Sequence, residues 1–194
     1  MNQNIMTVRL EEISDLRFGY YTKPKEKGEI AYLQAKNFDE VGNSKQDLDN
    51  FLDPDPKNRL HLLNEGDILL IGKGNKNSAW VYKNEFGPAI ASSIFFVIRP
   101  NQKKVLPEYL TIIFNTIQTQ TYFQALGAGS SIPSIRKSEL EAFTFILPPL
   151  ALQEKIVGIK RLQNKELQLC KIIIAEKEKR NSAVINKLIN EEIK

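Results

Sequence analysis

The pattern of apolar and polar positions divides the chain into two parts. Before residue 148, apolar residues occur in short runs separated by turns rich in glycine, proline and charge. Beyond Pro149 they recur every three or four residues, with no further proline and one glycine, Gly158. The first pattern is typical of short strands and turns, and the second of a helix. We therefore expect a domain in residues 1–147 and a long helix in 148–194.

Within the domain, the spacing of apolar residues predicts strands, two helices and one long surface loop. The segment from Ala89 to Ile98, which includes the apolar run Ile94–Ile98, predicts the main core strand. A helix is expected from Leu106 to Leu126, with Pro107 in its first turn and Gly127 after its end. Ser138 and Glu141 match a capping box for a short helix at 139–142. The other predicted segments are strands at 29–35, 68–71, 79–82 and 143–147 and a loop at 42–60. These elements indicate an α+β fold, mainly β, ending in a long helix.

The predicted C-terminal helix is too long to be covered by its own domain. About 43 helical residues extend roughly 65 Å, whereas the preceding 147 residues should have a radius of gyration of about 15 Å. Packing along the same domain is the simpler alternative, and the length argues against it. Steps of four and three place an incomplete heptad seam on one face, which favours an antiparallel coiled coil. The expected dimerisation residues are Leu152, Ile156, Ile159, Cys170, Ile173, Val184 and Leu188.

Composition narrows the possible chemistry. Cys170 is the only cysteine and His61 the only histidine, so one chain lacks the ligands of an N/S zinc site. A Ser-His-Asp triad would have to use His61. No apolar run reaches the roughly 18 residues of a membrane span, and no signal peptide is visible. A single cysteine fits a reducing compartment, and we expect a cytoplasmic protein that contacts no membrane.

Charge is distributed unevenly along the chain. Residues 1–150 contain 17 basic and 17 acidic residues, whereas residues 151–194 contain 10 and 6. Within the first part, the stretch 39–67 is strongly acidic, so the remainder is positive. A domain that is neutral overall can still bind nucleic acid if its charges are segregated on the surface. The alternative is charge scattered for solubility.

Several motifs together resemble a known family. Asn64-Glu65-Gly66-Asp67-Ile68-Leu69 is followed by Leu106-Pro107-Glu108-Tyr109-Leu110, Gly127-Ala128-Gly129-Ser130-Ser131-Ile132-Pro133 and Ser138-Glu139-Leu140. The most specific motif, Leu147-Pro148-Pro149-Leu150-Ala151-Leu152-Gln153-Glu154-Lys155-Ile156-Val157, leads into the long helix. This order resembles the target-recognition domain and spacer helix of type I restriction–modification specificity subunits. The resemblance covers nearly the whole chain.

The resemblance implies a non-catalytic subunit that binds double-stranded DNA. Family members guide a methyltransferase subunit, which uses S-adenosylmethionine, and an ATP-dependent restriction subunit, so this chain is expected to bind no cofactor or metal itself. They commonly contain two recognition domains and two spacer helices, whereas one of each occurs here. A half-size form is therefore expected. It would pair with itself, or with a second half subunit, to read a bipartite symmetric site in DNA.

Three segments offer side chains suited to DNA. Lysine and arginine suit guanine or phosphate, and asparagine and glutamine suit adenine. The first segment contains Lys73, Asn75, Lys76 and Asn77; the second contains Ser130, Ser131, Arg136 and Lys137; the third contains Lys25, Lys27, Tyr32 and Gln34. Each segment could equally be an ordinary solvated loop. The acidic stretch should face away from phosphates.

Two other functions fit parts of the pattern. The chain could be a regulatory protein that binds the methyltransferase without reading DNA, and the long helix suits that role equally well. It could also be a stand-alone nuclease. The sequence contains no P-loop, no Asn-Pro-Pro-Tyr or Asp-Pro-Pro-Tyr motif and no clear carboxylate cluster for metal, which disfavours an enzyme.

Overall fold

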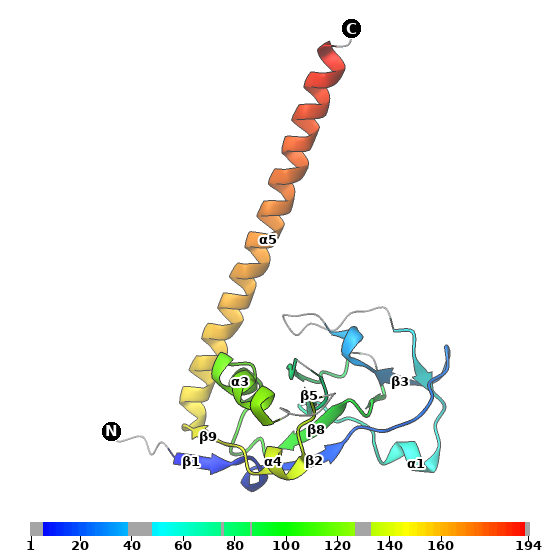
Figure 1. The fold of residues 1–194 in the computed structure, drawn as a ribbon, viewed down its shortest axis with the longest axis vertical. Coiled ribbons are helices and arrows are strands. Elements are labelled where there is room, and N and C mark those ends of the chain that lie inside the picture. The colour runs from blue at the N-terminus through cyan, green and yellow to red at the C-terminus, as the bar shows by residue number, and fades with distance from the viewer. Residues whose placement is uncertain (1–5, 39–47, 75, 86, 127–132, 193–194) are drawn as a thin grey trace. The chain divides into compact units, whose positions relative to one another are not determined.

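The computed structural model describes residues 6–38, 48–74, 76–85, 87–126 and 133–192 (Figure 1). The chain forms two compact units, Met1–Lys155 and Ile156–Lys194. The first unit contains the strands and the short helices. The second consists of the greater part of one long helix. The expected α+β class is confirmed.

A four-stranded antiparallel sheet forms the centre of the first unit. Its strand order is β2 (Ser14–Phe18), β8 (Phe95–Pro100), β5 (Ile68–Ile71) and β6 (Ala79–Val81). Both inner strands consist almost wholly of buried residues, which explains their continuous apolar sequence. The strands predicted at 68–71 and 79–82 are therefore confirmed as an antiparallel pair.

Two smaller sheets complete the β structure. In the first, β3 (Ile30–Leu33) pairs antiparallel with β4 (Phe51–Leu52) and parallel with β7 (Ala89–Ala91). In the second, β1 (Met6–Arg9) pairs antiparallel with β9 (Thr144–Leu147) and so brings the two ends of the domain together. The strands expected at 29–35 and 143–147 are confirmed.

The prediction of one strand from Ala89 to Ile98 is wrong. The segment forms two strands, β7 and β8, in different sheets. Ser92 N–H donates to Leu33 O at 2.9 Å, and Phe95 N–H donates to Ser92 O at 3.0 Å. The chain therefore turns at Ser92 and passes from one sheet to the other. An apolar run buried in both strands shows no periodicity that could reveal this turn.

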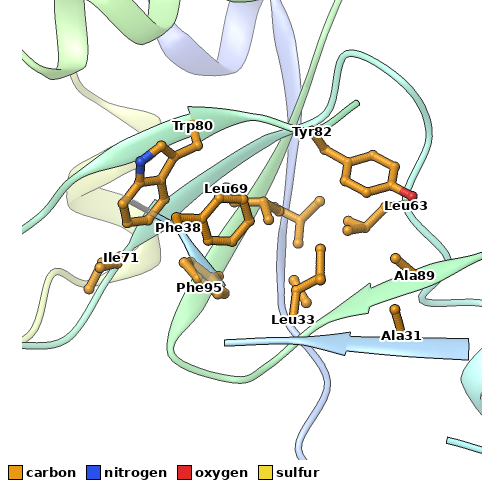
Figure 2. Close-up of a cluster of buried hydrophobic side chains, with 12 residues drawn as sticks. Ala31, Leu33, Phe38, Leu63, Leu69, Ile71, Trp80, Tyr82, Ala89 and Phe95 are labelled. Atoms are coloured by element: carbon orange, nitrogen blue, oxygen red, sulfur yellow. The ribbon is translucent and has the colours of Figure 1, made fainter. Parts of the chain in front are cut away.

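The main core lies between the four-stranded sheet and the sheet of β3, β4 and β7, and aromatic side chains form its centre (Figure 2). Phe38 stacks on Trp80 with ring centroids 4.8 Å apart, and Phe95 meets both rings edge-on. Leu33 and Leu69 are fully buried in the same cluster. Offset and edge-to-face aromatic contacts fix the rings more specifically than apolar burial alone. The core thus holds the sheets, and the loops at their ends, in a defined arrangement.

The helix predicted from Leu106 to Leu126 is interrupted. The structure has α2 (Pro107–Phe114) and α3 (Ile117–Leu126), with Asn115 between them. The Asn115 side chain accepts a hydrogen bond from Ala79 N–H at 3.0 Å and donates to Ala79 O at 2.8 Å. This pairing with the backbone of β6 competes with a continuous helix, as asparagine side chains often do. Pro107 is the first helical residue, as expected.

Several shorter elements lie at the edges of the sheets. The capping box predicted at Ser138 is wrong, since α4 (Lys137–Glu141) begins earlier and Glu139 Oε2 accepts from Arg136 N–H at 2.8 Å. The described part of the predicted loop contains β4 and α1 (Pro56–Arg59), which Asp55 caps through Lys57 N–H and Asn58 N–H. The 3-10 turns η1 (Leu10–Glu12) and η2 (Ala35–Asn37) complete the unit. Gly127 lies outside the described residues.

The long helix is confirmed as α5 (Leu150–Glu192), with 43 residues. None of the helices in the described ranges combines the length and apolar character needed to cross a membrane. Coiled-coil pairing of α5 stays a prediction.

Candidate nucleic-acid interface

Two of the three predicted DNA-contacting segments lie side by side. Lys73 forms an isolated antiparallel bridge with Ser134. Gly74 N–H donates to Pro133 O at 2.8 Å, and Ile135 N–H donates to Gly72 O at 2.9 Å. The loop that follows β5 is thus joined by its backbone to the segment that leads into α4. Residues about 60 positions apart in the sequence therefore form one surface.

This surface has exposed cations. Lys73, Lys76 and Arg136 are exposed, and Ser134 is exposed beside them. Lys137 is half-buried and its Nζ lies 3.3 Å from Glu141 Oε1, so part of its charge is compensated within α4. Lysine and arginine at adjoining loops provide the positive charge that phosphate contacts require. Asn75, Ser130 and Ser131, also predicted to contact DNA, lie outside the described residues.

Asn77 has a structural role instead of the exposed one expected. Its side chain is 2% exposed, and its Nδ2 donates to Ile71 O at 2.9 Å. The backbone carbonyl of Asn77 accepts a hydrogen bond from Gln120 Nε2 at 2.9 Å. Asn77 therefore holds the end of the loop against β5 and α3. A buried amide offers nothing to a base edge, so the prediction that Asn77 contacts DNA is wrong.

The third predicted segment is directed elsewhere. Tyr32 is 3% exposed, its hydroxyl donates to Tyr20 O at 2.8 Å, and burial raises the pKa of Tyr32. It belongs to the core, which contradicts its predicted DNA contact. Lys25 pairs with Asp53, and the half-buried Gln34 accepts from Asn50 Nδ2 at 3.4 Å. Lys27 is exposed. Lys25 and Gln34 thus contact residues of the acidic stretch.

A buried carboxylate fixes the frame of the central sheet. Asp67 is 1% exposed, and Arg99 binds it with two hydrogen bonds of 2.7 Å each, from Nε to Oδ1 and from Nη2 to Oδ2. Asn64 N–H donates to Oδ2 at 2.8 Å. Hydrogen bonding to Asp67 raises the pKa of Arg99. This bidentate pair joins the turn before β5 to the end of β8.

A second arginine adds to this cluster. Arg17 Nη2 lies 3.8 Å from Asp67 Oδ2, and the guanidinium donates to Leu60 O at 2.9 Å and Leu62 O at 2.8 Å. Burial, and then the charge of Arg99, lower the pKa of Arg17. In the sequence Asp67 belongs to the acidic stretch 39–67 and to a motif of the family resemblance, and neither predicts its burial. Its signal was an acidic residue directly before a fully apolar strand, which needs a partner when the strand is buried.

The start of α5 is tied to the domain by one buried amide. Gln153 is fully buried, and its Oε1 accepts from Leu106 N–H at 2.8 Å. Its Nε2 donates to Pro148 O at 2.7 Å and to Lys104 O at 3.1 Å. The glutamine of the Leu-Pro-Pro-Leu junction thereby satisfies three backbone groups next to the first turns of α2 and α5.

The residues predicted for dimerisation lie along α5. Leu152 and Ile156 are half-buried, whereas Ile159, Cys170, Ile173, Val184 and Leu188 are exposed. Other exposed apolar residues of this helix are Leu162, Leu167, Leu169, Ile172, Ile174, Ile185 and Ile189. We call these exposed residues from 159 to 189 the apolar face of α5. Apolar surface of this extent is typical of protein interaction sites.

The described residues show no constellation for metal chemistry. No three histidine, cysteine, aspartate or glutamate side chains among them are close enough to hold a metal ion. His61 lies against Tyr20, with ring centroids 4.6 Å apart, and burial lowers its pKa.

Comparison with known proteins gives consistent matches. The family model described as type I restriction modification DNA specificity domain matches residues 2–179. A curated relative, the type I restriction enzyme HindI specificity subunit of Haemophilus influenzae, is 31% identical over 101 residues, which are 50% of this chain and 22% of the relative. The matched stretch therefore spans about a fifth of the length of that relative.

Three solved structures have a similar fold. One comes from work on complex assembly and conformational transition of the type I R-M system and has a TM-score of 0.69 at 18% identity. The match covers 92% of this chain and 43% of the chain in that structure. The S subunit from M. genitalium has a TM-score of 0.60 at 14% identity, covering 86% and 41%. The S subunit from Thermoanaerobacter tengcongensis has a TM-score of 0.59 at 16% identity, covering 86% and 39%. At these identities the likeness establishes the fold alone.

Proposed function

The chain belongs to the family of type I restriction modification DNA specificity domains, and from this premise we propose that it is a non-catalytic unit that reads a DNA sequence. The observation that carries the proposal is the backbone pairing of Lys73 with Ser134. This pairing joins two cation-bearing loops at one surface of a domain with the family fold. Duplex DNA, as a polyanion with base edges exposed in the major groove, is the ligand that suits such loops.

The chain is further proposed to act as a dimer. It contains one recognition domain and one long helix, and the helix has an exposed apolar face. Two copies joined antiparallel through residues 150–194 would be related by a two-fold axis. Each copy would then present the same loops to DNA, so the site would consist of two inverted halves separated by a spacer. A second half subunit in place of an identical copy would give two unrelated half-sites.

Catalysis belongs to partner subunits in this proposal. The bound DNA would be presented to a methyltransferase subunit, which carries S-adenosylmethionine, and to a restriction subunit that uses ATP. The chain itself would hold neither cofactor and would act in the cytoplasm. Its contribution is the selection of the site, because phosphate contacts give affinity and base contacts give specificity.

The DNA-binding proposal is tested with the double variant Lys73→Ala/Lys76→Ala. Each lost phosphate contact should reduce the slope of log K against log salt by about 0.9. We therefore expect weaker duplex binding and a slope smaller by about 1.8, measured by fluorescence anisotropy between low and moderate salt. The control is Lys57→Ala/Lys83→Ala, which removes the same charge outside the two paired loops and should leave the slope nearly unchanged. If the two double variants bound DNA with the same affinity and the same salt slope, the 72–76 loop would not be part of the interface.

A regulatory protein without DNA binding is the second candidate. The apolar face of α5 supports it, because that face could cover a methyltransferase subunit equally well. Tight binding to the methyltransferase, together with no measurable affinity of the complex for any duplex, would favour this candidate over the first.

A further inference from the structure

Phe18, at the end of β2, presents a fixed apolar surface to solvent. Its side chain is 52% exposed although the residue is part of the central sheet. It is paired with Phe96 in the register of β2 and β8, and the two ring centroids lie 5.0 Å apart at 35°. The contact with Phe96 restricts the Phe18 ring while much of it stays accessible. An exposed aromatic ring held in this way is suited to a specific contact.

A narrow hollow connects this ring with the two cation-bearing loops. Its volume is about 20 Å³, and its lining includes Phe18, Lys73, Ile94, Phe96, Ser134 and Ile135. A space of this size accommodates one water molecule or a group of similar size, such as a methyl. Its lining is mainly apolar, so a methyl group fits its chemistry better than a water molecule, which needs several polar partners.

The surroundings of the hollow match a DNA ligand in charge. Among the residues that the structure describes, none that lines it is acidic, and Lys73 is exposed at its edge. Arg136 follows the lining residue Ile135 and is also exposed. Phosphates on either side of a base could therefore meet these cations while the base edge faces the hollow. The backbone also approaches closely here, because a Cβ on Gly72 would meet the Phe96 ring at 2.5 Å.

We propose that Phe18 is a specificity-determining residue that contacts the C5 methyl group of a thymine in the major groove. Apolar contact with this methyl group is a known way to read thymine, and phenylalanine is among the residues that make it. Insertion of the ring between base pairs would need both ring faces free, whereas Phe96 covers one side of Phe18. This inference rests on the proposed DNA-reading function and adds the base that one side chain reads.

The experiment begins with selection of bound sequences from a pool of random DNA duplexes by the purified chain. Phe18→Ala should select the same motif with a weakened preference for thymine at one position in each half-site. Phe18→Leu keeps an apolar contact with Phe96 and should weaken that preference less. Leu60→Ala, another exposed apolar residue that does not line the hollow, should select the wild-type motif. Thermal melting checks that every variant is folded.

A second arm removes only the methyl group. Replacing the selected thymine by uracil should weaken wild-type binding about fourfold, as expected for loss of one buried methyl group. Binding by Phe18→Ala should be insensitive to the same replacement. Equal sensitivity of the two proteins, or an unchanged thymine preference, would overturn the role of Phe18 while leaving sequence reading intact. A wild-type protein that enriches no sequence would instead overturn the proposed function, and this inference with it.

Discussion

Asp67 holds together parts of the domain that are distant in sequence. Its buried carboxylate accepts two hydrogen bonds from Arg99 and one from Asn64 N–H, and Arg17 lies nearby. The turn before β5, the end of β8 and strand β2 therefore meet at one charged group. The loop that carries Lys73 begins at the opposite end of β5, and its backbone pairs with Ser134. The position of both cation-bearing loops therefore depends on β5 being in place.

Substitution of Asp67 should therefore destabilise the domain strongly. Asp67→Asn keeps the shape but removes the charge that binds Arg99. Because the Arg99 side chain is 38% exposed, the cost is that of lost hydrogen bonding to a charged group, about 1.5–3 kcal/mol. We expect a loss of about this size in the free energy of unfolding, measured by urea denaturation. The neighbouring Glu65 is exposed and is not the residue that Arg17 and Arg99 bind. Glu65→Gln should therefore change stability by less than about 0.5 kcal/mol. Equal stability of both variants would contradict the role of Asp67.

At the residue scale, sequence reasoning identified suitable side-chain types better than their directions. Lys73 and Arg136 are exposed on adjoining loops, as a contact with DNA requires. Asn77 and Tyr32 carry equally suitable polar groups but point inward, where they satisfy backbone carbonyls. Whether a polar side chain turns inward depends on backbone groups supplied by distant segments, and one sequence does not specify them.

At the scale of elements, Gln153 explains the junction between domain and helix. In the sequence, the motif around Pro148 and Pro149 is a signature of the family resemblance and specifies no contact. In the structure its glutamine closes a network with Leu106 N–H, Lys104 O and Pro148 O. The helix start is thereby attached to the turn that begins α2.

Loss of this network should loosen the junction. Gln153→Leu retains the buried volume but leaves the three backbone groups without partners, and each buried unsatisfied group costs about 1–3 kcal/mol. We expect a decrease of at least about 2 kcal/mol in the free energy of unfolding and faster amide hydrogen exchange at Leu106. Gln163→Leu, at a position of α5 with no such contacts, serves as control. Slow exchange at Leu106 in the first variant would argue against the network.

Element prediction succeeded where local pattern and burial agree. Alternation predicted β3, and short apolar segments bounded by turn residues predicted β5, β6 and β9. Proline and glycine positions predicted the start of α2 and the length of α5. The prediction of continuous elements was wrong at Ser92 and Asn115. At Asn115 the side chain bonds to the backbone of β6, which competes with a continuous helix. At Ser92 the backbone closes a turn with Phe95 N–H after the end of β7, and the chain passes into the other sheet.

At the scale of the whole molecule, α5 is the element that exposes apolar surface suited to binding another protein. Its apolar face extends from Ile159 to Ile189 and is exposed in a single chain. Self-association would remove this surface from water, which is the main driving force for protein association. Sequence analysis anticipated the length of the helix from its periodicity, whereas the partner depends on a second chain.

Charged substitutions on this face should prevent dimer formation. Ile159→Lys/Ile173→Lys places two like charges at the seam, so we expect monomers at concentrations where the wild-type chain is dimeric. Sedimentation equilibrium measures the difference. Asn164→Lys/Gln168→Lys adds the same charge at positions outside the proposed seam and should leave most of the dimer intact. A wild-type chain that stays monomeric at high concentration would contradict self-association directly.

The most direct test of sequence reading is methylome sequencing of a host that carries the complete system, with and without the gene for this chain. The expected result is one bipartite methylated motif with inverted, related halves that disappears when the gene is deleted. Two unrelated halves would show that the chain pairs with a different half subunit. An unchanged methylation pattern after deletion would contradict the proposal that this chain selects the DNA site.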